Sequence, residues 1–331
     1  MAAFGVAVAL YQGDASLTST SLTTAAAAED YVVRLPVTVT DGSGRPVCGL
    51  TQQDFSISQD GEAQTIHSFA DKEIPLSLAL IVDTSPQMRG PWMNDTFSAI
   101  RQLVTDAVNV EDEVSMWVFG RRPLELQAWT TKNAMLSARY NIPDGGGAPF
   151  FETLSLVSKN MDKARYARRV VIGVTGGATS DGWRRQAGPA FAPPAGRPEP
   201  PSPVLATANP WSPTEERERA LKDLKSQTLL FYAIGLEMAR PSEQKLEPVP
   251  PIDMNELRLT SELTGGYVDQ VKSKADLARA LTRVREELQS QYLIGYVSSR
   301  GPDGKPHEVK VTVKNPDHRV RARLSYTAKK R

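Results

Sequence analysis

The chain has 331 residues, and its 39 Lys and Arg against 38 Asp and Glu leave a formal net charge of +1. This balance excludes the strong overall positive field of a dedicated nucleic-acid binder. Apolar residues make up 40% of the chain and charged residues 23%, as in globular proteins with a sizeable core. At roughly 150 residues per domain, the length predicts about two domains.

Cysteine and histidine are scarce, with one cysteine, Cys48, and three histidines in the whole chain. An internal disulfide framework and a cysteine zinc site are therefore excluded. No apolar stretch reaches the roughly 18 residues that a membrane-spanning helix needs, so we expect no transmembrane segment.

Residues 1–30 are kept apart from the fold prediction as a disordered tail or the remnant of a secretory signal. The stretch 1–10 is apolar and short, but no Lys or Arg precedes Arg34 and a long Ser/Thr/Ala-rich stretch follows. We favour the signal remnant. It implies an extracytoplasmic or periplasmic location, and a cytoplasmic location is the alternative.

Residues 31–73 are predicted to form a small antiparallel unit. Residues 33–39 alternate between apolar and polar side chains, which is typical of a half-buried strand. Residues 55–58 and 65–69 alternate in the same way around Asp60-Gly61, a strong signal for a hairpin turn. We therefore predict that these last two strands pair with each other.

Residues 74–290 have a different pattern. The nearly continuous apolar run 76–82 predicts a strand that is buried on both faces. Strands and helices then alternate, which implies a doubly wound, mostly parallel sheet with helices on both faces. Further strands are predicted at 114–119, 124–129 (antiparallel), 170–174, 229–234 and 266–271, and helices at 97–108, 150–161, 214–224, 257–263 and 274–289.

Residues 291–331 return to alternating strands, at 292–297, 309–313 and 320–326. Neither this segment nor 31–73 can bury a core alone, so we expect them to form one β-sandwich into which the α/β domain is inserted. Nine prolines between Pro189 and Pro213 forbid a helix or a central strand there. This Pro-rich insert follows the strand 170–174 and is expected near the carboxyl edge of the sheet, where ligands of such sheets bind.

Several short motifs follow one another along the chain. They are Val39-Thr40-Asp41, Gly44 to Val47, Gly49-Leu50-Thr51, Asp54-Phe55, Asp60-Gly61, Ile81 to Ser85, Gln291 to Tyr296 and Arg321 to Tyr326. In this order and spacing the sequence resembles the von Willebrand factor type A domains, specifically the bacterial von Willebrand factor A-related family common in acidobacteria. The resemblance implies a six-stranded sheet flanked by helices, with a metal-ion-dependent adhesion site at its carboxyl edge.

That adhesion site needs D-x-S-x-S after the first strand, a Thr in a Gly-rich loop and an Asp after the fourth strand, because Mg²⁺ prefers six oxygen ligands. Asp83 and Ser85 match the first two positions. Three of the five positions depart from the pattern: Gln87, Ala148 (or Gly147) and Gly176. We therefore expect no cofactor here, with Asp83 capping backbone N–H groups at the start of the next helix. A weakly bound Mg²⁺ on Asp83, Ser85 and Gln87 is the alternative.

Aromatic residues in segments expected near this edge are candidates for contact with a protein partner. The candidates are Trp92, Phe150, Phe151, Trp183, Phe191 and Trp211. In the alternative interpretation, the Pro-rich insert folds back and these rings bury one another.

Enzyme signatures such as G-x-S-x-G, the phosphate-binding loop and H-E-x-x-H are missing from the sequence. The sequence thus predicts a non-enzymatic, metal-independent protein-interaction module, a scaffold or accessory subunit of an envelope-associated complex. One alternative is a Mg²⁺-dependent adhesion domain using Asp83 and Ser85. The other is an enzyme that binds a small ligand at the Gly-rich edge.

Overall fold

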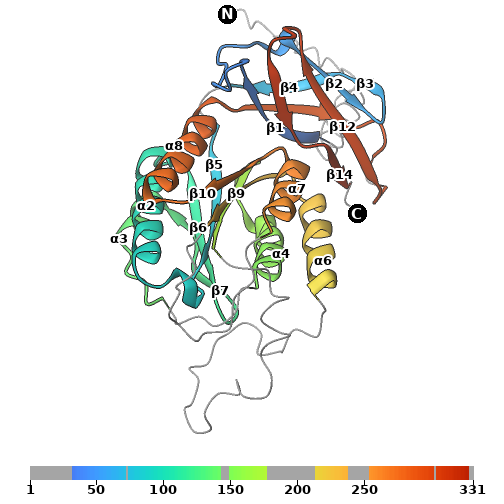
Figure 1. Cartoon of the computed structure of the whole chain (residues 1–331). Coiled ribbons are helices and arrows are strands. Elements are labelled where there is room, and N and C mark those ends of the chain that lie inside the picture. The colour runs from blue at the N-terminus through green and yellow to red at the C-terminus, as the bar shows by residue number, and fades with distance from the viewer. Residues whose placement is uncertain are drawn as a thin grey trace, which may run out of the picture.

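A six-stranded sheet flanked by helices forms the larger part of the protein, and two four-stranded antiparallel sheets form the smaller part (Figure 1). The computed structural model describes residues 32–71, 74–142, 149–176, 213–237, 253–301 and 303–327. The predicted fold class is confirmed. The interpretation of residues 1–30 as a tail or signal remnant lies outside the described residues.

The strands of the larger sheet are β5 (Leu76–Asp83), β6 (Glu113–Phe119), β7 (Pro123–Thr131), β8 (Arg168–Thr175), β9 (Leu229–Leu236) and β10 (Val268–Val271). The helices are α2 (Pro91–Ala107), α3 (Lys132–Ser137), α4 (Phe150–Asn160), α6 (Pro213–Ser226), α7 (Met254–Thr264) and α8 (Lys274–Ser290). Short 3-10 helices are η1 (Gln52–Asp54), η2 (Pro86–Met88) and η3 (Met161–Lys163). None of the helices in the described ranges is both long and apolar enough to cross a membrane.

The strand order in this sheet is β10-β9-β8-β5-β6-β7. Every neighbouring pair is parallel except β6 with β7, which is antiparallel as predicted. The order places β5 in the interior, between β6 and β8. A parallel strand in this position must bury both faces, which explains the continuous apolar run in its sequence.

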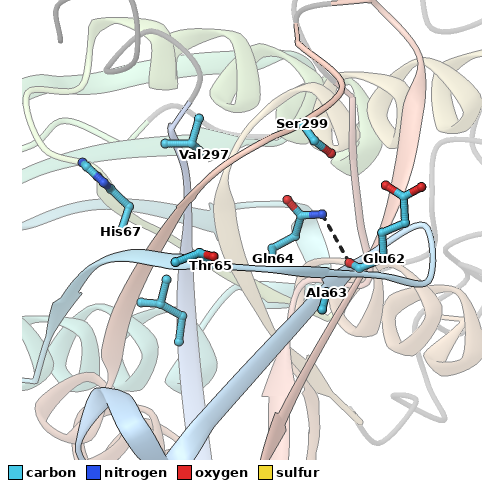
Figure 2. Close-up of a pocket in the computed structure, with 8 residues that line it drawn as sticks. Glu62, Ala63, Gln64, Thr65, His67, Val297 and Ser299 are labelled. Carbon is cyan, nitrogen blue, oxygen red and sulfur yellow. Dashed lines mark hydrogen bonds between the residues drawn. The ribbon is translucent and has the colours of Figure 1, made fainter.

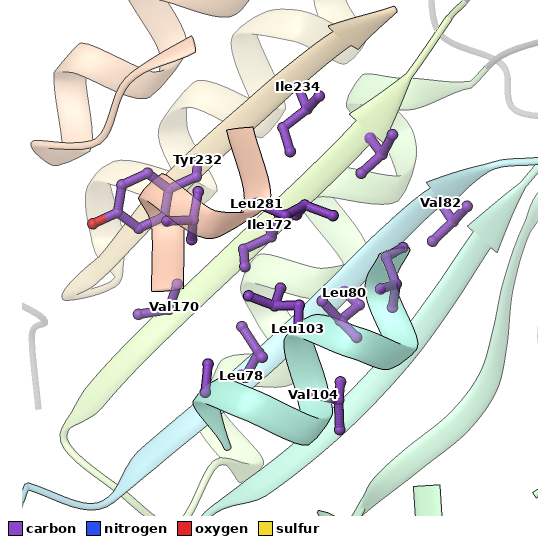
Figure 3. Close-up of a cluster of buried hydrophobic side chains, with 14 of the residues drawn as sticks. Leu78, Leu80, Val82, Leu103, Val104, Val170, Ile172, Tyr232, Ile234 and Leu281 are labelled. Carbon is purple, nitrogen blue, oxygen red and sulfur yellow. The ribbon is translucent and has the colours of Figure 1, made fainter. Parts of the chain in front are cut away.

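Strand β5 supplies both cores of the larger domain, and all eight of its residues are buried. Because side chains alternate along a strand, Leu78, Leu80 and Val82 lie in the cluster formed with α2 and α8 (Figure 3). Ala79 and Ile81 lie in the opposite cluster, with residues of α4, α6 and α7. The helices therefore cover both faces of the sheet.

Residues from both ends of the chain build the sandwich. Its strands are β1 (Val32–Thr40), β2 (Phe55–Gln59), β3 (Glu62–Gln64), β4 (Ile66–Ala70), β11 (Tyr292–Val297), β12 (Pro306–Val313), β13 (Arg319–Ala322) and β14 (Ser325–Thr327). The two sheets have the orders β13-β1-β11-β4 and β14-β12-β2-β3. Their facing side chains form a single core, which includes Leu35, Ile57, Ile294 and Val309.

The predicted pairing of residues 55–58 with 65–69 is wrong. Strand β2 pairs with β3, whereas β4 joins the other sheet and pairs with β11. The reason is the tight turn, in which Asp60 (φ 51°) and Gly61 (φ 81°) are both left-handed. A two-residue turn of this kind fixes Gln59 opposite Glu62, so the residues directly after it must form the partner strand.

The sandwich is anchored to the helical domain by a buried arginine. Arg323, 1% exposed, donates hydrogen bonds to the carbonyl oxygens of Leu224 (2.9 Å) and Lys225 (3.0 Å) in the last turn of α6. Burial lowers the pKa of Arg323 to about 10. A cation at this position satisfies helix carbonyls that have no partner within the helix and complements the negative end of the helix dipole.

A second contact determines which edge of the larger sheet faces the sandwich. Arg168, the first residue of β8, donates from Nε to Oε1 of Gln291 (3.0 Å), the residue before β11. The amino ends of the parallel strands thus face the sandwich, and their carboxyl ends open at the far end of the molecule (Figure 1). That far edge is free of the sandwich.

Gly265 lies where the helical domain and the sandwich pack closely together. It ends α7 at φ +87°, and a Cβ there would lie 2.5 Å from the carbonyl carbon of Ala322 and 2.8 Å from the nitrogen of Arg323. Gly265→Ala should lower the free energy of unfolding by roughly 3 kcal/mol, from the left-handed backbone and from steric overlap together. Urea unfolding measures the loss.

Gly44 is the matched control, because it has φ +84° and open space around it. Gly44→Ala should lower the free energy of unfolding by only about 1 kcal/mol. Equal losses in the two variants would contradict a close fit at Gly265.

Candidate functional site

The carboxyl ends of β5 and β8 lie side by side at the centre of the larger sheet. From β5, the sheet extends to β6 on one side and to β8 on the other, so the strand order reverses direction at this point. In doubly wound sheets, ligands bind in the crevice outside the carboxyl ends at such a reversal. Asp83 ends β5 and Thr175 ends β8, so both lie where the sequence placed the site.

The Asp83 carboxylate accepts at least three hydrogen bonds from the protein itself. Oδ1 accepts from the backbone N–H of Ser85 (2.8 Å). Oδ2 accepts from the Thr175 hydroxyl (3.2 Å) and from the backbone N–H of Gly176 (3.0 Å). A carboxylate offers about four acceptor positions, so most of its capacity is used within the chain.

Asp83 has no exposed surface. Burial raises the pKa of this carboxyl, because removal from water disfavours the charged form, and the hydrogen bonds from Ser85, Gly176 and Thr175 oppose that rise. The arrangement ties the end of β5 to the end of β8. The bond from Ser85 lies just before η2, which has no side-chain cap, so the structure does not show the helix-capping role that the sequence suggested for Asp83.

Ser85 and Gln87 follow Asp83 in and around η2. Ser85 has no exposed surface and directly precedes η2. Gln87 lies within η2, and its buried Nε2 has no hydrogen-bond partner among the described residues. Gly90, at φ +84°, then turns the chain into α2.

The residues described at this edge do not fit a Mg²⁺ ion. Gly176, where the resemblance implies an acidic ligand, directs an N–H donor at Asp83. Across the described ranges, no group of three or more His, Cys, Asp and Glu side chains could hold a metal ion. Ala148 and Gly147, the candidate positions of the family's threonine, lie outside the described residues. Among the described residues, those around Asp83 therefore supply fewer oxygens than the six that the ion prefers.

The structure corrects the interpretation of two aromatic candidates. Phe150 and Phe151 are 1% and 3% exposed and belong to the core between the sheet and α4. The Phe150 ring lies 5.7 Å from that of Phe119 and 6.1 Å from that of Phe231, measured between ring centres. Both phenylalanines are therefore unavailable to a partner, because the first turn of α4 packs them against the strands.

Trp92 has a different environment from these phenylalanines. It lies in the first turn of α2 and is partly buried against the core cluster that contains Leu80. Trp183, Phe191 and Trp211 lie outside the described residues, as does the Pro-rich insert except for Pro213, which begins α6.

The sequence interpretation missed two arginines at the same edge. Arg121 and Arg122 lie in the three-residue loop between β6 and β7, and both are exposed. The backbone N–H of Thr84 donates to the carbonyl oxygen of Phe119 (2.7 Å), which holds this loop beside the end of β5. The available signal was a short loop, Gly120 to Arg122, between two predicted strands.

A hollow of about 450 Å³ lies in the sandwich, away from this edge. Residues 62–67, Val297 and Ser299 line it, and Figure 2 shows them around the point where the chain crosses from β3 to β4. The hollow is open and contains none of the site residues that the sequence suggested.

No protein-family model matches this sequence, and no curated protein does. Among solved structures, the chain is similar to the PilB minor pilin from Streptococcus sanguinis, with a TM-score of 0.46 and 11% identity over 66% of this chain and 62% of that one. For a von Willebrand factor type A protein from Catenulispora acidiphila, the TM-score is 0.45 and the identity 11%, over 90% of this chain and 72% of that one. For BatB from Bacteroides thetaiotaomicron, the TM-score is 0.40 and the identity 12%, over 65% of this chain and 100% of that one. Structural neighbours thus include von Willebrand factor A domains, and likenesses this distant carry no argument about activity.

Asp83→Asn should lower the free energy of unfolding by about 2 kcal/mol. Whichever way the new amide turns, its NH₂ group faces a backbone N–H, of Ser85 or of Gly176, at a position with no exposed surface. Chemical denaturation of the purified protein measures the loss.

Asp253→Asn is the matched control. The Asp253 carboxylate accepts from two backbone N–H groups at the start of α7, at an exposed position. Asn caps helices as well as Asp does, so the expected loss is below about 0.5 kcal/mol. A loss at position 83 as small as this would contradict the role of the Ser85 and Gly176 N–H groups in holding the carboxylate.

Proposed function

We propose that this chain is a von Willebrand A-like protein-interaction module with a degenerate adhesion site, which binds a protein partner without a metal ion. In this proposal it has no catalytic activity and serves as a scaffold or accessory subunit of a larger, envelope-associated complex. The partner binds at the carboxyl edge of the larger sheet.

The hydrogen bonds of Asp83 carry this proposal. In a metal-dependent adhesion site, an oxygen of this aspartate would serve the ion. Here the protein's own donors, the N–H groups of Ser85 and Gly176 and the Thr175 hydroxyl, occupy the carboxylate. In this proposal, these donors stabilise the charge of the carboxylate in place of a metal ion.

The placement of the sandwich supports a binding role for the opposite edge. Arg323 and Gly265 fix the sandwich against the far ends of α6 and α7. The sandwich, attached at the amino edge, therefore does not cover the carboxyl edge of the larger sheet. Trp92, partly exposed at the start of α2, supplies an aromatic side chain at that edge.

A pull-down with the tagged full chain from cells that produce it tests the metal independence. The proteins recovered in excess Mg²⁺ and in EDTA should be the same and equally abundant. Trp92→Ala should reduce their recovery roughly tenfold, the effect of losing about 1.4 kcal/mol of binding energy. Calorimetric titration of the wild-type chain with Mg²⁺ should give no binding heat.

Trp129→Ala is the control for the tryptophan substitution. Trp129 is also partly buried, but it packs against the other core cluster and its indole N–H faces the carbonyl oxygen of Asn160 at 3.4 Å. Its substitution should leave recovery unchanged. Recovery lost in EDTA, with Mg²⁺ binding abolished by Asp83→Ala, would instead establish the metal-dependent adhesion alternative.

A further inference from the structure

The loop between β6 and β7 places two cations at the proposed binding edge. Phe119, the last residue of β6, pairs with Pro123, the first of β7, so Arg121 and Arg122 lie at the tip of a tight connection. The neighbouring strand β5 ends directly beside it, since Asp83 pairs with Phe119. The loop is thus next to the crevice at the centre of the sheet.

Neither Arg121 nor Arg122 makes a hydrogen bond or ion pair with any residue in the described part of the chain. Some other exposed arginines are paired, for example Arg279 with Asp276 and Arg283 with Asp269. An unpaired guanidinium keeps its full set of donors for an external acceptor.

Of the described acidic groups around the loop, Glu125 is the nearest in the chain to Arg122, and it accepts from the Asn160 amide at 3.2 Å. Asp83 is buried and occupied by protein donors. Asp95 forms an ion pair with Lys274, at 2.6 Å. Glu152 lies in the first turn of α4, on the other face of the sheet, where it complements that helix's dipole. The first turn of α2 carries no acidic side chain, so its N-terminal dipole adds to the positive potential.

Apolar side chains lie at the same edge of the sheet as the two arginines, since Trp92 begins the helix that follows β5. Leu124, two residues after Arg122, and Trp92 are both partly buried against the same core cluster. We define Arg121, Arg122, Trp92 and Leu124 as the arginine corner. It combines two free guanidinium groups with a partly exposed indole and a leucine.

We propose that the arginine corner binds an acidic segment of the partner protein, with carboxylates that flank an apolar side chain. Guanidinium groups bind carboxylates through paired N–H···O bonds, and an apolar residue between the carboxylates meets Trp92 and Leu124. This inference rests on the proposed function and names the chemistry of its partner.

Fluorescence anisotropy with a short labelled peptide that alternates Asp with Leu tests the inference on the full chain. The wild-type protein should bind this peptide at low salt, and added salt should weaken binding because it screens the charges. The double variant Arg121→Glu/Arg122→Glu should bind at least tenfold more weakly. Arg121→Lys/Arg122→Lys should lie in between, because Lys keeps the charge without the planar fork.

Two controls make the result specific. A peptide that alternates Lys with Leu should not bind. The double variant Lys310→Glu/Arg319→Glu reverses the same number of charges on exposed positions of the sandwich and should bind the acidic peptide as the wild type does. Thermal unfolding of each variant confirms that it is folded.

Three results would each overturn the inference. The wild-type protein does not bind the acidic peptide, the Arg121→Glu/Arg122→Glu variant binds it as tightly as the wild type does, or the wild type binds the Lys–Leu peptide as tightly as the acidic one. Failure of the proposed function is a separate outcome. If pulled-down partners are retained in EDTA and lost in Trp92→Ala but unaffected by the arginine reversals, the interaction module stands and only its acidic specificity falls.

Discussion

The burial of β5 on both faces is the constraint on which the rest of the structure depends. Its side chains enter one core with α2 and α8 and another with α4, α6 and α7, so this single strand joins the two halves of the larger domain. The same burial places Asp83 at the centre of the carboxyl edge with no exposed surface. A carboxylate in that position must be satisfied by its neighbours, because an unpaired buried charge is costly. Ser85, Thr175 and Gly176 supply the donors.

The sandwich and the larger domain form one unit through buried polar contacts between them. Glu287 of α8 is 3% exposed and pairs with Arg321 of β13. Burial raises the pKa of Glu287, and Arg321 opposes that rise. Tyr232 of β9 donates to Glu287 at 3.1 Å and accepts from the Gln291 side chain at 2.9 Å. Truncating one member of such a network leaves others unsatisfied, which makes the relative position of the two parts specific.

This placement separates two roles along the length of the molecule. The amino edge of the larger sheet is used for internal attachment, through Arg168 and the last turn of α6. The carboxyl edge carries Asp83, Trp92 and the β6–β7 loop. Our proposals of metal-independent partner binding and of an acidic partner segment both concern this second edge, where protein donors bind Asp83 and the β6–β7 loop carries two arginines.

The candidate site was only partly predictable from the sequence. The position of Asp83 followed from the end of an apolar run, and the departures at Gln87 and Gly176 were visible as residue types. The bonds that occupy Asp83 were not, because Thr175 and Gly176 are more than 90 residues away in the chain and meet it only when β8 pairs with β5. Arg121 and Arg122 were overlooked for a similar reason. A short loop has no periodicity, and its place beside β5 depends on strand order.

The sequence by itself determined the alternation of strands and helices, the double burial of β5 and the tight turn at Asp60-Gly61, because side-chain periodicity and left-handed backbone positions act over a few residues. Only the tertiary structure decided that β4 leaves its neighbour β3 for the other sheet and that Phe150 and Phe151 face inward. An apolar side chain has the same sequence signal whether it meets a partner or a core. Which of the two it meets is fixed by the surfaces that pack over it.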